Sequence, residues 1–301
     1  MHSLIYGVVA ANNIEYGKHQ SRMVTQPGLY PKHMNVYKIE AGTAQHIGNR
    51  PEQTNRVALF TGARSPGYMM AVLADGVTGG SSASDQVLMT AKQQFDLFKP
   101  GDDPSIERLQ GLLRDIVLET HTMLKLNAVT SQNEAHSTFV GLIITPKGTG
   151  VWAHVGDSRL YRFVRAECVV RTSDVPYIEH LVGTDKLPLE AARNHRHSKL
   201  LFNVLGNSRK EPFVAVGHHD DLAAGDTFLL ASDGLWHFFT DSELGAATSK
   251  NTPRQASELL INKAVERAQG KGGNCTMAIV KLVKPPKEVP NYTVERMRRA
   301  V

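Results

Sequence analysis

The sequence has very little cysteine, few aromatic residues and no long apolar run. Only two cysteines, Cys168 and Cys275, occur among its 301 residues, and they lie far apart. A disulfide-stapled domain is therefore excluded, and no Cys/His spacing indicates a zinc site. No apolar segment approaches the roughly 20 residues that a helix needs to cross a bilayer. We expect no membrane contact.

Strong charge of either sign is also missing. The formal net charge is +5, and part of the basic excess lies in the C-terminal tail. Basic and aromatic residues do not alternate as they do in nucleic-acid-binding grooves, so we expect no nucleic-acid partner. The N-terminus, MHSLIYGVVAANN, has no basic stretch before its short apolar run, which argues against a signal peptide. We expect a cytoplasmic monomer.

Apolar patterning divides the chain into an N-terminal extension (1–35), one domain (36–283) and a basic tail (284–301). Amphipathic periods predict three long helices, over 82–98, 104–126 and 253–268. Short runs rich in Val, Ile and Phe, bounded by Gly, Pro or Asp, predict ten strands. These strands are expected at 36–44, 56–60, 68–74, 139–144, 150–155, 160–165, 168–171, 213–217, 227–231 and 276–283. Strands in runs, with helices inserted between them, predict the α+β class.

Three of the predicted strands end in an aspartate next to a glycine. Asp75 lies in VLADGVTGG, Asp157 in HVGDSRLYR and Asp233 in FLLASDGL. Three such carboxylates at one place would suit a hard divalent cation such as Mg²⁺ or Mn²⁺, which prefers oxygen ligands. The alternative is that each aspartate only forms a hairpin turn, because Asp-Gly is a common hairpin signal. Spacing alone leaves both interpretations open.

The order of several motifs resembles the metal-dependent type 2C protein serine/threonine phosphatases. They are VLADGVTGG, HSTFVGLII, VWAHVGDSRLYR, FLLASDGLW and GGNCTMAIV, and the resemblance covers about 36–282. It implies a four-layer α-β-β-α sandwich, in which two antiparallel sheets are flanked by helix pairs. It also implies hydrolysis of phosphoserine and phosphothreonine in a protein substrate, by a water that two metal ions activate.

The resemblance assigns roles to five residues. Asp75 and Asp233 are the catalytic carboxylates: Asp75 would bridge both ions, and Asp233 would bind the second. The Gly76 carbonyl would bind the first ion, and Asp157 a third, weaker one. Arg50, in HIGNRPEQTN, would bind the substrate phosphate, for which a guanidinium fork is well suited. The Ser-Thr pair in HSTFVGLII is expected to be structural.

The sequence departs from the family at four positions. An acidic pair after the arginine is replaced by Thr54 and Asn55, and the aspartate of D-N-x-T is replaced by Gly273. His237 follows SDGLW where an aspartate is usual, which favours Mn²⁺ over Mg²⁺ at the third site. Glycine offers no side-chain ligand, and carboxylates offset the repulsion between two ions. We therefore expect low metal affinity, with Glu52 as the nearest carboxylate that could compensate.

Three functions remain open at this point. The first is a working phosphatase with a weak, Mn²⁺- or Mg²⁺-dependent site. The second is a pseudophosphatase that binds a phosphoprotein or another partner without turnover. The third is a metal-free binding module whose Asp-Gly turns are only hairpin corners. The third requires Asp75 and Asp233 to lie in unrelated parts of the fold.

Overall fold

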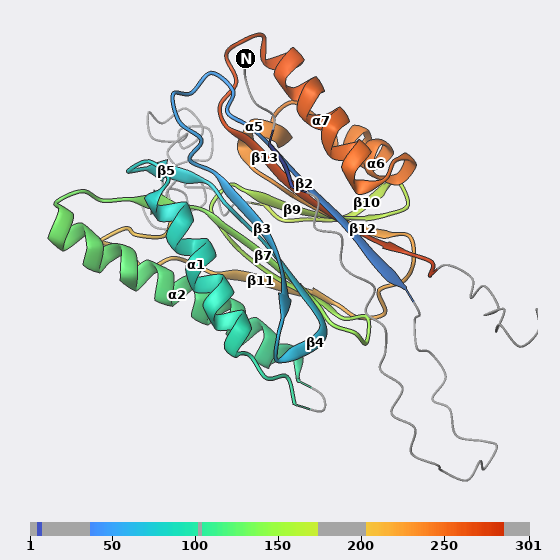
Figure 1. The fold of residues 1–301 in the computed structure, drawn as a ribbon, viewed down its shortest axis with the longest axis horizontal. Coiled ribbons are helices and arrows are strands. Elements are labelled where there is room, and N and C mark those ends of the chain that lie inside the picture. Colours follow the sequence, from blue (N-terminus) through green and yellow to red (C-terminus); the bar gives the residue numbers. More distant parts are fainter. Residues whose placement is uncertain (1–4, 8–36, 102–103, 174–202, 286–301) are drawn as a thin grey trace, which may run out of the picture.

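The computed structural model describes residues 5–7, 37–101, 104–173 and 203–285 (Figure 1). Its framework is a pair of facing antiparallel β-sheets. The first sheet contains, in spatial order, β1 (Ile5–Gly7), β2 (Lys38–His46), β13 (Cys275–Val283), β12 (Asp226–Ala231), β9 (Arg159–Val164) and β10 (Glu167–Arg171). The second contains β11 (Ala215–His219), β8 (Gly150–Val155), β7 (Phe139–Ile144), β4 (Ser65–Ala74) and β3 (Arg56–Gly62).

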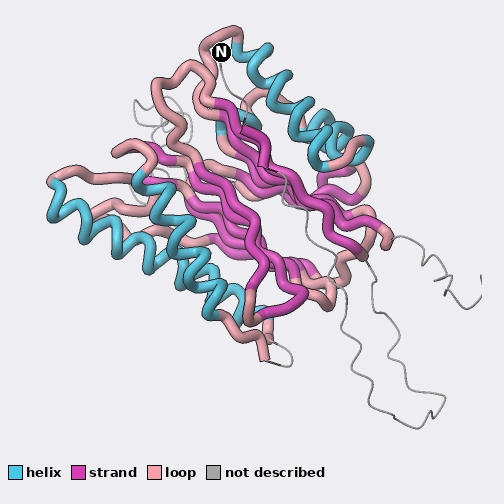
Figure 2. The backbone as a smooth tube through the Cα atoms, viewed as in Figure 1, coloured by secondary structure: helices cyan, strands magenta, loops and turns pink. Residues whose placement is uncertain are grey.

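Helix pairs cover the outer face of each sheet (Figure 2). The second sheet is covered by α1 (Ser82–Leu97) and α2 (Ile106–Ser131), and the first by α6 (Asp241–Lys250) and α7 (Pro253–Ala268). A short helix, α5 (Asp233–Trp236), follows β12, and a small ribbon pairs β5 (Gly76–Thr78) with β6 (His136–Ser137). The predicted four-layer α-β-β-α architecture is confirmed.

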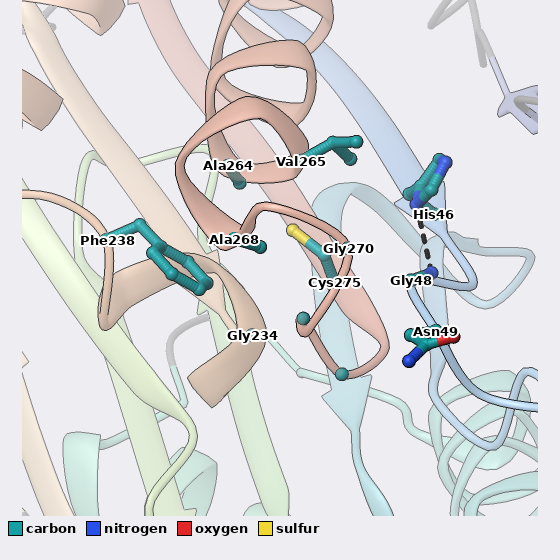
Figure 3. A pocket seen from close by; sticks show the side chains of 12 residues that line it. His46, Gly48, Asn49, Gly234, Phe238, Ala264, Val265, Ala268, Gly270 and Cys275 are labelled. Atoms are coloured by element: carbon teal, nitrogen blue, oxygen red, sulfur yellow. Dashed lines mark hydrogen bonds between the residues drawn. The ribbon is translucent and has the colours of Figure 1, made fainter.

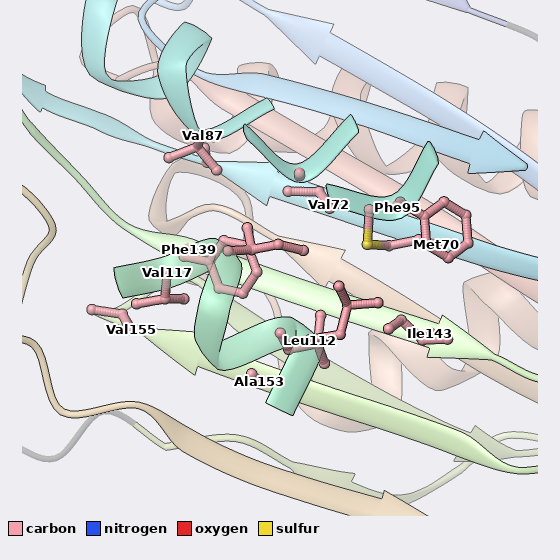
Figure 4. Close-up of a cluster of buried hydrophobic side chains, with 14 of the residues drawn as sticks. Met70, Val72, Val87, Phe95, Leu112, Val117, Phe139, Ile143, Ala153 and Val155 are labelled. Atoms are coloured by element: carbon pink, nitrogen blue, oxygen red, sulfur yellow. The ribbon is translucent and has the colours of Figure 1, made fainter. Parts of the chain in front are cut away.

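Each interface between layers has its own apolar core. Under α1 and α2, Phe95 of α1 belongs to one cluster with Met70, Phe139 and Ile143 of the second sheet (Figure 4). A second cluster joins α6 and α7 to the first sheet. The third lies between the two sheets. Strands such as β7 and β12 are buried along their whole length because each sheet is covered on both faces.

Helix α6 was not predicted, although a start signal is present. Among the residues that α6 buries, only Leu244 is large and apolar, so its hydrophobic period is weak. Its first turn is instead marked by a capping box, in which Thr240 and Glu243 exchange side-chain and backbone hydrogen bonds. Helix α7 starts in the same way at Thr252, with Pro253 in its first turn.

The predicted domain, 36–283, begins close to the start of β2 and ends with β13. The expected extension contributes β1, which pairs antiparallel with β2 at the edge of the first sheet. The remainder of 1–35, and 286–301 of the tail, lie outside the described residues. No helix in the described part has both the length and the apolar character needed to cross a membrane.

The inter-sheet core predicts a large difference between two phenylalanines. Phe228 is fully buried between the sheets, whereas Phe213 is 59% exposed. Phe228→Ala should lower the free energy of unfolding by about 3–5 kcal/mol, because the removed ring leaves a cavity. Phe213→Ala, the matched control, should change it by less than about 1 kcal/mol. Urea unfolding measures both, and equal losses would contradict this core assignment.

Candidate active site

Asp75 and Asp233 reach the same place from opposite sheets. Asp75 follows β4 of the second sheet, and Asp233 is the first residue of α5, just after β12 of the first sheet. Their carboxyl groups are hydrogen-bonded to each other. The two residues are therefore in contact although they lie far apart in the sequence. This geometry contradicts the interpretation of their turns as unrelated hairpin corners.

The surroundings of Asp75 strongly disfavour its charged form. Burial raises the pKa of Asp75 to about 8, and the negative charges of Asp233 and Asp157 add to this effect. A hydrogen bond from the side chain of Asn55 acts in the opposite direction and lowers this pKa. Three carboxyl groups and an amide thus act on one point. Such crowding of like charge is typical of a site that binds a cation.

The backbone of Asp75 is held by the Ser-Thr pair. The Asp75 amide donates to Thr138 Oγ1 at 3.0 Å, and the Asp75 carbonyl accepts from the Thr138 amide at 2.9 Å and from Ser137 Oγ at 3.1 Å. Thr138 Oγ1 also lies 2.8 Å from Ser158 Oγ, next to Asp157. The pair therefore ties the Asp75 and Asp157 turns together through hydroxyl groups.

Gly76 is required by a close approach of two backbones. A Cβ at this position would lie 2.7 Å from the Thr54 carbonyl oxygen and 2.8 Å from that of Gly80. Any side chain here would push the segment after Asp75 away from the segment that carries Asn55. The glycine after Asp75 is thus a packing requirement as well as a turn signal.

The Asp157 turn is fixed by an aromatic contact that sequence reasoning missed. Trp236 Nε1 donates to the Asp157 carbonyl at 3.0 Å, and the Arg159 guanidinium lies 3.4 Å from the centre of the Trp236 ring. Trp236 also stacks with His237, whose Nδ1 lies 3.2 Å from the Asp233 carbonyl oxygen. The only signal for this arrangement was the joint presence of GDSR and SDGLW.

Asn274 clamps the loop that carries Arg50, a role that was not predicted from the sequence. Its Oδ1 accepts from the Thr54 amide at 2.8 Å and from Thr54 Oγ1 at 2.9 Å. Its Nδ2 donates to the carbonyls of Ile47 at 2.8 Å and Glu52 at 3.0 Å. These four bonds bracket Arg50, whose exposed side chain has no hydrogen bond or ion pair within the described residues.

The two altered positions, Asn55 and Gly273, lie in this region. Asn55 is fully buried, and its Oδ1 has no hydrogen-bond partner among the described residues. A Cβ at Gly273 would have only Arg50 within 4 Å, with Nε at 3.8 Å and Nη2 at 4.0 Å. The Glu52 carboxylate lies over the glycine turn after β5, with Oε2 3.2 Å from a Cβ at Gly80.

The side-chain oxygen atoms of Asp75, Asp233 and Asn55 fit a divalent cation that keeps part of its water shell. Mg²⁺ is commonly bound through one or two carboxylates together with waters. Asp75 and Asp233 provide such a pair, beside the unpartnered oxygen of Asn55. Among the described residues, no group of three or more His, Cys, Asp or Glu side chains is placed to hold an ion. The side chains therefore suit a hydrated ion rather than one enclosed by protein ligands.

A cavity of about 240 Å³ adjoins this site between the end of α7, α5 and the end of β2 (Figure 3). It shares Gly234 and Gly273 with the acidic site. Its other walls include Phe238, Ala264 and the buried thiol of Cys275, and no carboxylate lines it. The cavity is therefore a neighbour of the ion site and not the ion site itself.

The pKa of Asp75 predicts how stability depends on pH in metal-free protein. Between its ordinary value of 3.8 and about 8, the folded state binds more protons than the unfolded state, so stability should fall as pH rises through this window. Asp75→Asn removes this titration and should flatten the dependence. Urea unfolding in EDTA at several pH values tests this, with the exposed Asp96→Asn as control. An unchanged slope in Asp75→Asn would contradict the assignment.

The clamp predicts an unusually costly asparagine substitution. Asn274→Ala should lower the free energy of unfolding by about 2–3 kcal/mol, because partners of its four bonds are left unsatisfied. Amide exchange at Thr54 should also become faster. Asn251→Ala, which removes a single bond to the Ala247 carbonyl, should cost about 1 kcal/mol. Unchanged Thr54 exchange would argue against the clamp.

Comparison with known proteins identifies relatives of the chain. No family model matches. The serine/threonine protein phosphatase PstP of Mycobacterium tuberculosis is 25% identical over 239 residues, which are 76% of this chain but only 42% of PstP. The serine/threonine phosphatase stp of Listeria welshimeri is 27% identical over 216 residues, 69% of this chain and 82% of that protein.

Solved structures show the same fold. The serine/threonine phosphatase of S. agalactiae superposes with a TM-score of 0.69 at 22% identity, over 81% of this chain and 99% of that one. The catalytic domain of PstP, in complex with manganese ions, gives a TM-score of 0.63 at 22% identity, over 82% and 100%. The resemblance drawn from the sequence is thereby confirmed: the chain is similar in sequence to bacterial serine/threonine phosphatases and has the fold of their solved structures.

Proposed function

We propose that this chain is a metal-dependent protein phosphatase of the type 2C kind, which hydrolyses phosphoserine and phosphothreonine in a protein substrate. One observation carries the proposal. Burial raises the pKa of Asp75 to about 8, and the negative charges of Asp233 and Asp157, which come from two other strand ends, add to this effect. Such a concentration of negative charge binds divalent cations, on which phosphoryl chemistry at neutral pH commonly depends.

Each residue has a role that follows from its place. Asp75 and Asp233 would hold Mn²⁺ or Mg²⁺, with the Gly76 carbonyl as a further oxygen ligand. When bound, the ion lowers the pKa of a coordinated water and polarises the phosphoryl group. Arg50 binds the substrate phosphate with a guanidinium that is exposed and unpaired in the described part of the chain. Asp157, to which the resemblance assigns a weaker third ion, adds a negative charge beside this pair.

A cysteine nucleophile does not fit this chain. Cys275 is the cysteine near the site, and it is buried with only 3% of its surface exposed. Burial raises the pKa of the Cys275 thiol far above its usual range, so the thiol stays protonated at neutral pH. An attack by water, without a covalent phosphoenzyme, is therefore the mechanism that these residues support.

Weak metal binding is part of the proposal. Gly273 contributes no ligand, and Asn55 contributes a neutral amide in place of a carboxylate. The loss of a direct ligand should cost more than the roughly 10- to 100-fold that the loss of a supporting residue costs. Full activity should therefore require millimolar rather than micromolar Mn²⁺ or Mg²⁺.

A pseudophosphatase is the second candidate, and the glycine at position 273 is the observation that favours it. The frame of the site and the exposed Arg50 are present, while one side of the site lacks a carboxylate. This candidate predicts that the chain binds a phosphorylated protein and protects it. Binding of a phosphothreonine peptide would weaken in Arg50→Ala, and no turnover would follow at any metal concentration.

Turnover of para-nitrophenyl phosphate and of a phosphothreonine peptide distinguishes the two candidates. We expect hydrolysis that rises with Mn²⁺ into the millimolar range and falls more than about 100-fold in Asp75→Asn or Asp233→Asn. Asp96→Asn is the matched control, since Asp96 pairs with Lys92 on the surface of α1, and should keep wild-type activity. Folded, metal-loaded protein without turnover would contradict the phosphatase proposal and support the pseudophosphatase.

A further inference from the structure

The side of the site around Gly273 presents a positive charge instead of a ligand. A side chain would fit at position 273, because in the described part of the chain, apart from the two adjoining residues, no atom lies closer than 3.8 Å to its Cβ position. The atoms nearest to that position are Nε and Nη2 of Arg50. A guanidinium only donates hydrogen bonds and stays protonated in proteins, so it cannot coordinate a cation. This side therefore repels a second ion.

The residues that follow Gly273 cannot replace the missing ligand. Both polar atoms of the Asn274 side chain are fully used, with two bonds accepted by Oδ1 and two donated by Nδ2. The Cys275 thiol lies in the wall of the neighbouring cavity and stays protonated. Thr276 has a buried hydroxyl without a partner, which is a neutral group and cannot offset the charge of an ion.

The opposite side carries charge for a single ion. Asp75 and Asp233 are in contact, and two carboxylates balance the charge of one divalent cation. Asp157 adds one further negative charge nearby, which is less than the two charges that a second divalent ion carries. The buried Oδ1 of Asn55 provides a further acceptor without charge. Two divalent ions a few ångströms apart would need more negative charge than this pair supplies, and the nearby guanidinium makes the deficit larger.

We propose that this chain binds a single divalent cation at Asp75 and Asp233, and that the Arg50 guanidinium provides the positive charge on the Gly273 side of the site. The inference rests on the proposed function for its choice of ion, but not on turnover. A phosphate held between the ion and Arg50 is then contacted by one metal charge and one guanidinium charge. The site holds one ion because Gly273 provides no ligand for a second.

Manganese binding can be counted directly. Titration of the purified, metal-free chain with Mn²⁺, followed by electron paramagnetic resonance, should show one bound ion per chain with the hyperfine pattern of an isolated ion. A second ion should bind at least about 100-fold more weakly, beyond the usual effect of losing a supporting residue. Asp75→Asn should abolish the binding of the first ion.

Restoring the carboxylate should restore the second ion. Gly273→Asp should bind two Mn²⁺ per chain, with the altered spectrum of two magnetically coupled ions. Gly111→Asp is the matched control, since Gly111 lies in α2 with no atom within 4 Å of its Cβ position, and it should still bind one ion. Stoichiometry in the unmodified chain decides the question even when Gly273→Asp fails to fold.

The possible outcomes separate this inference from the proposed function. Two coupled ions in the unmodified chain would overturn the inference, whether or not the protein turns over substrate. A single ion in Gly273→Asp as well would also overturn it, because Gly273 would then not be the limiting position. One ion in the unmodified chain and two in Gly273→Asp, without turnover in either, would support the inference and contradict the phosphatase proposal.

Discussion

The contact between the carboxyl groups of Asp75 and Asp233 is the constraint on which the site depends. Asp75 follows strand β4 of the second sheet, and Asp233 follows strand β12 of the first. Their contact therefore requires these two strands to end beside each other. The frame around them serves this requirement. Thr138 holds the backbone of Asp75, and Gly76 lets the neighbouring segment approach closely. Neither residue adds charge to the site, but both hold the carboxyl group of Asp75 in position.

This constraint opposes the stability of the metal-free chain. A buried carboxyl whose pKa is raised to about 8 stays protonated at neutral pH or remains as an uncompensated charge, and both are unfavourable relative to water. An asparagine would fill the same space without this penalty. The proposed cation would offset this cost, because an ion that binds only the folded chain stabilises it by mass action. Under this proposal, the residues of the site stabilise the folded chain only when the ion is bound.

Much of the fold could be predicted from the sequence because its signals are local. The apolar period of α2 and the Thr252-Pro253 start of α7 are visible in the letters, and the strands are bounded by turn residues. Helix α6 could not be predicted from its period, since its stability depends on packing against α7 and β10. Edge strand β1 was also missed, because its pairing with β2 is a long-range contact across a segment without clear patterning.

The candidate site was predictable only in part, for a related reason. Ordered motifs were enough to name Asp75, Asp157, Asp233 and Arg50 as candidates. The residues that position them were not predictable, since their contacts join segments far apart in the chain. Asn274 bonds to Thr54 across 220 positions, and Trp236 to Asp157 across 79. Such contacts have no period and no spacing rule, so only the folded structure reveals them.

The hydrogen bonds that hold this site and the charges within it come from different residues. The site can therefore lack a carboxylate at position 273 and keep its geometry. The loop around Gly273 is still fixed, because the Asn49 amide donates to the Gly272 carbonyl at 2.8 Å and Asn274 keeps all four of its bonds. An aspartate at position 273 would contribute to none of these contacts through its side chain. The exchange of carboxylate for glycine therefore leaves Arg50 and the acidic pair in place and changes the electrostatics alone. Hydrolysis of a phosphorylated protein and binding without turnover are the two candidate functions, and the balance of charge at position 273 is the feature in which they are expected to differ, because the frame of the site serves both.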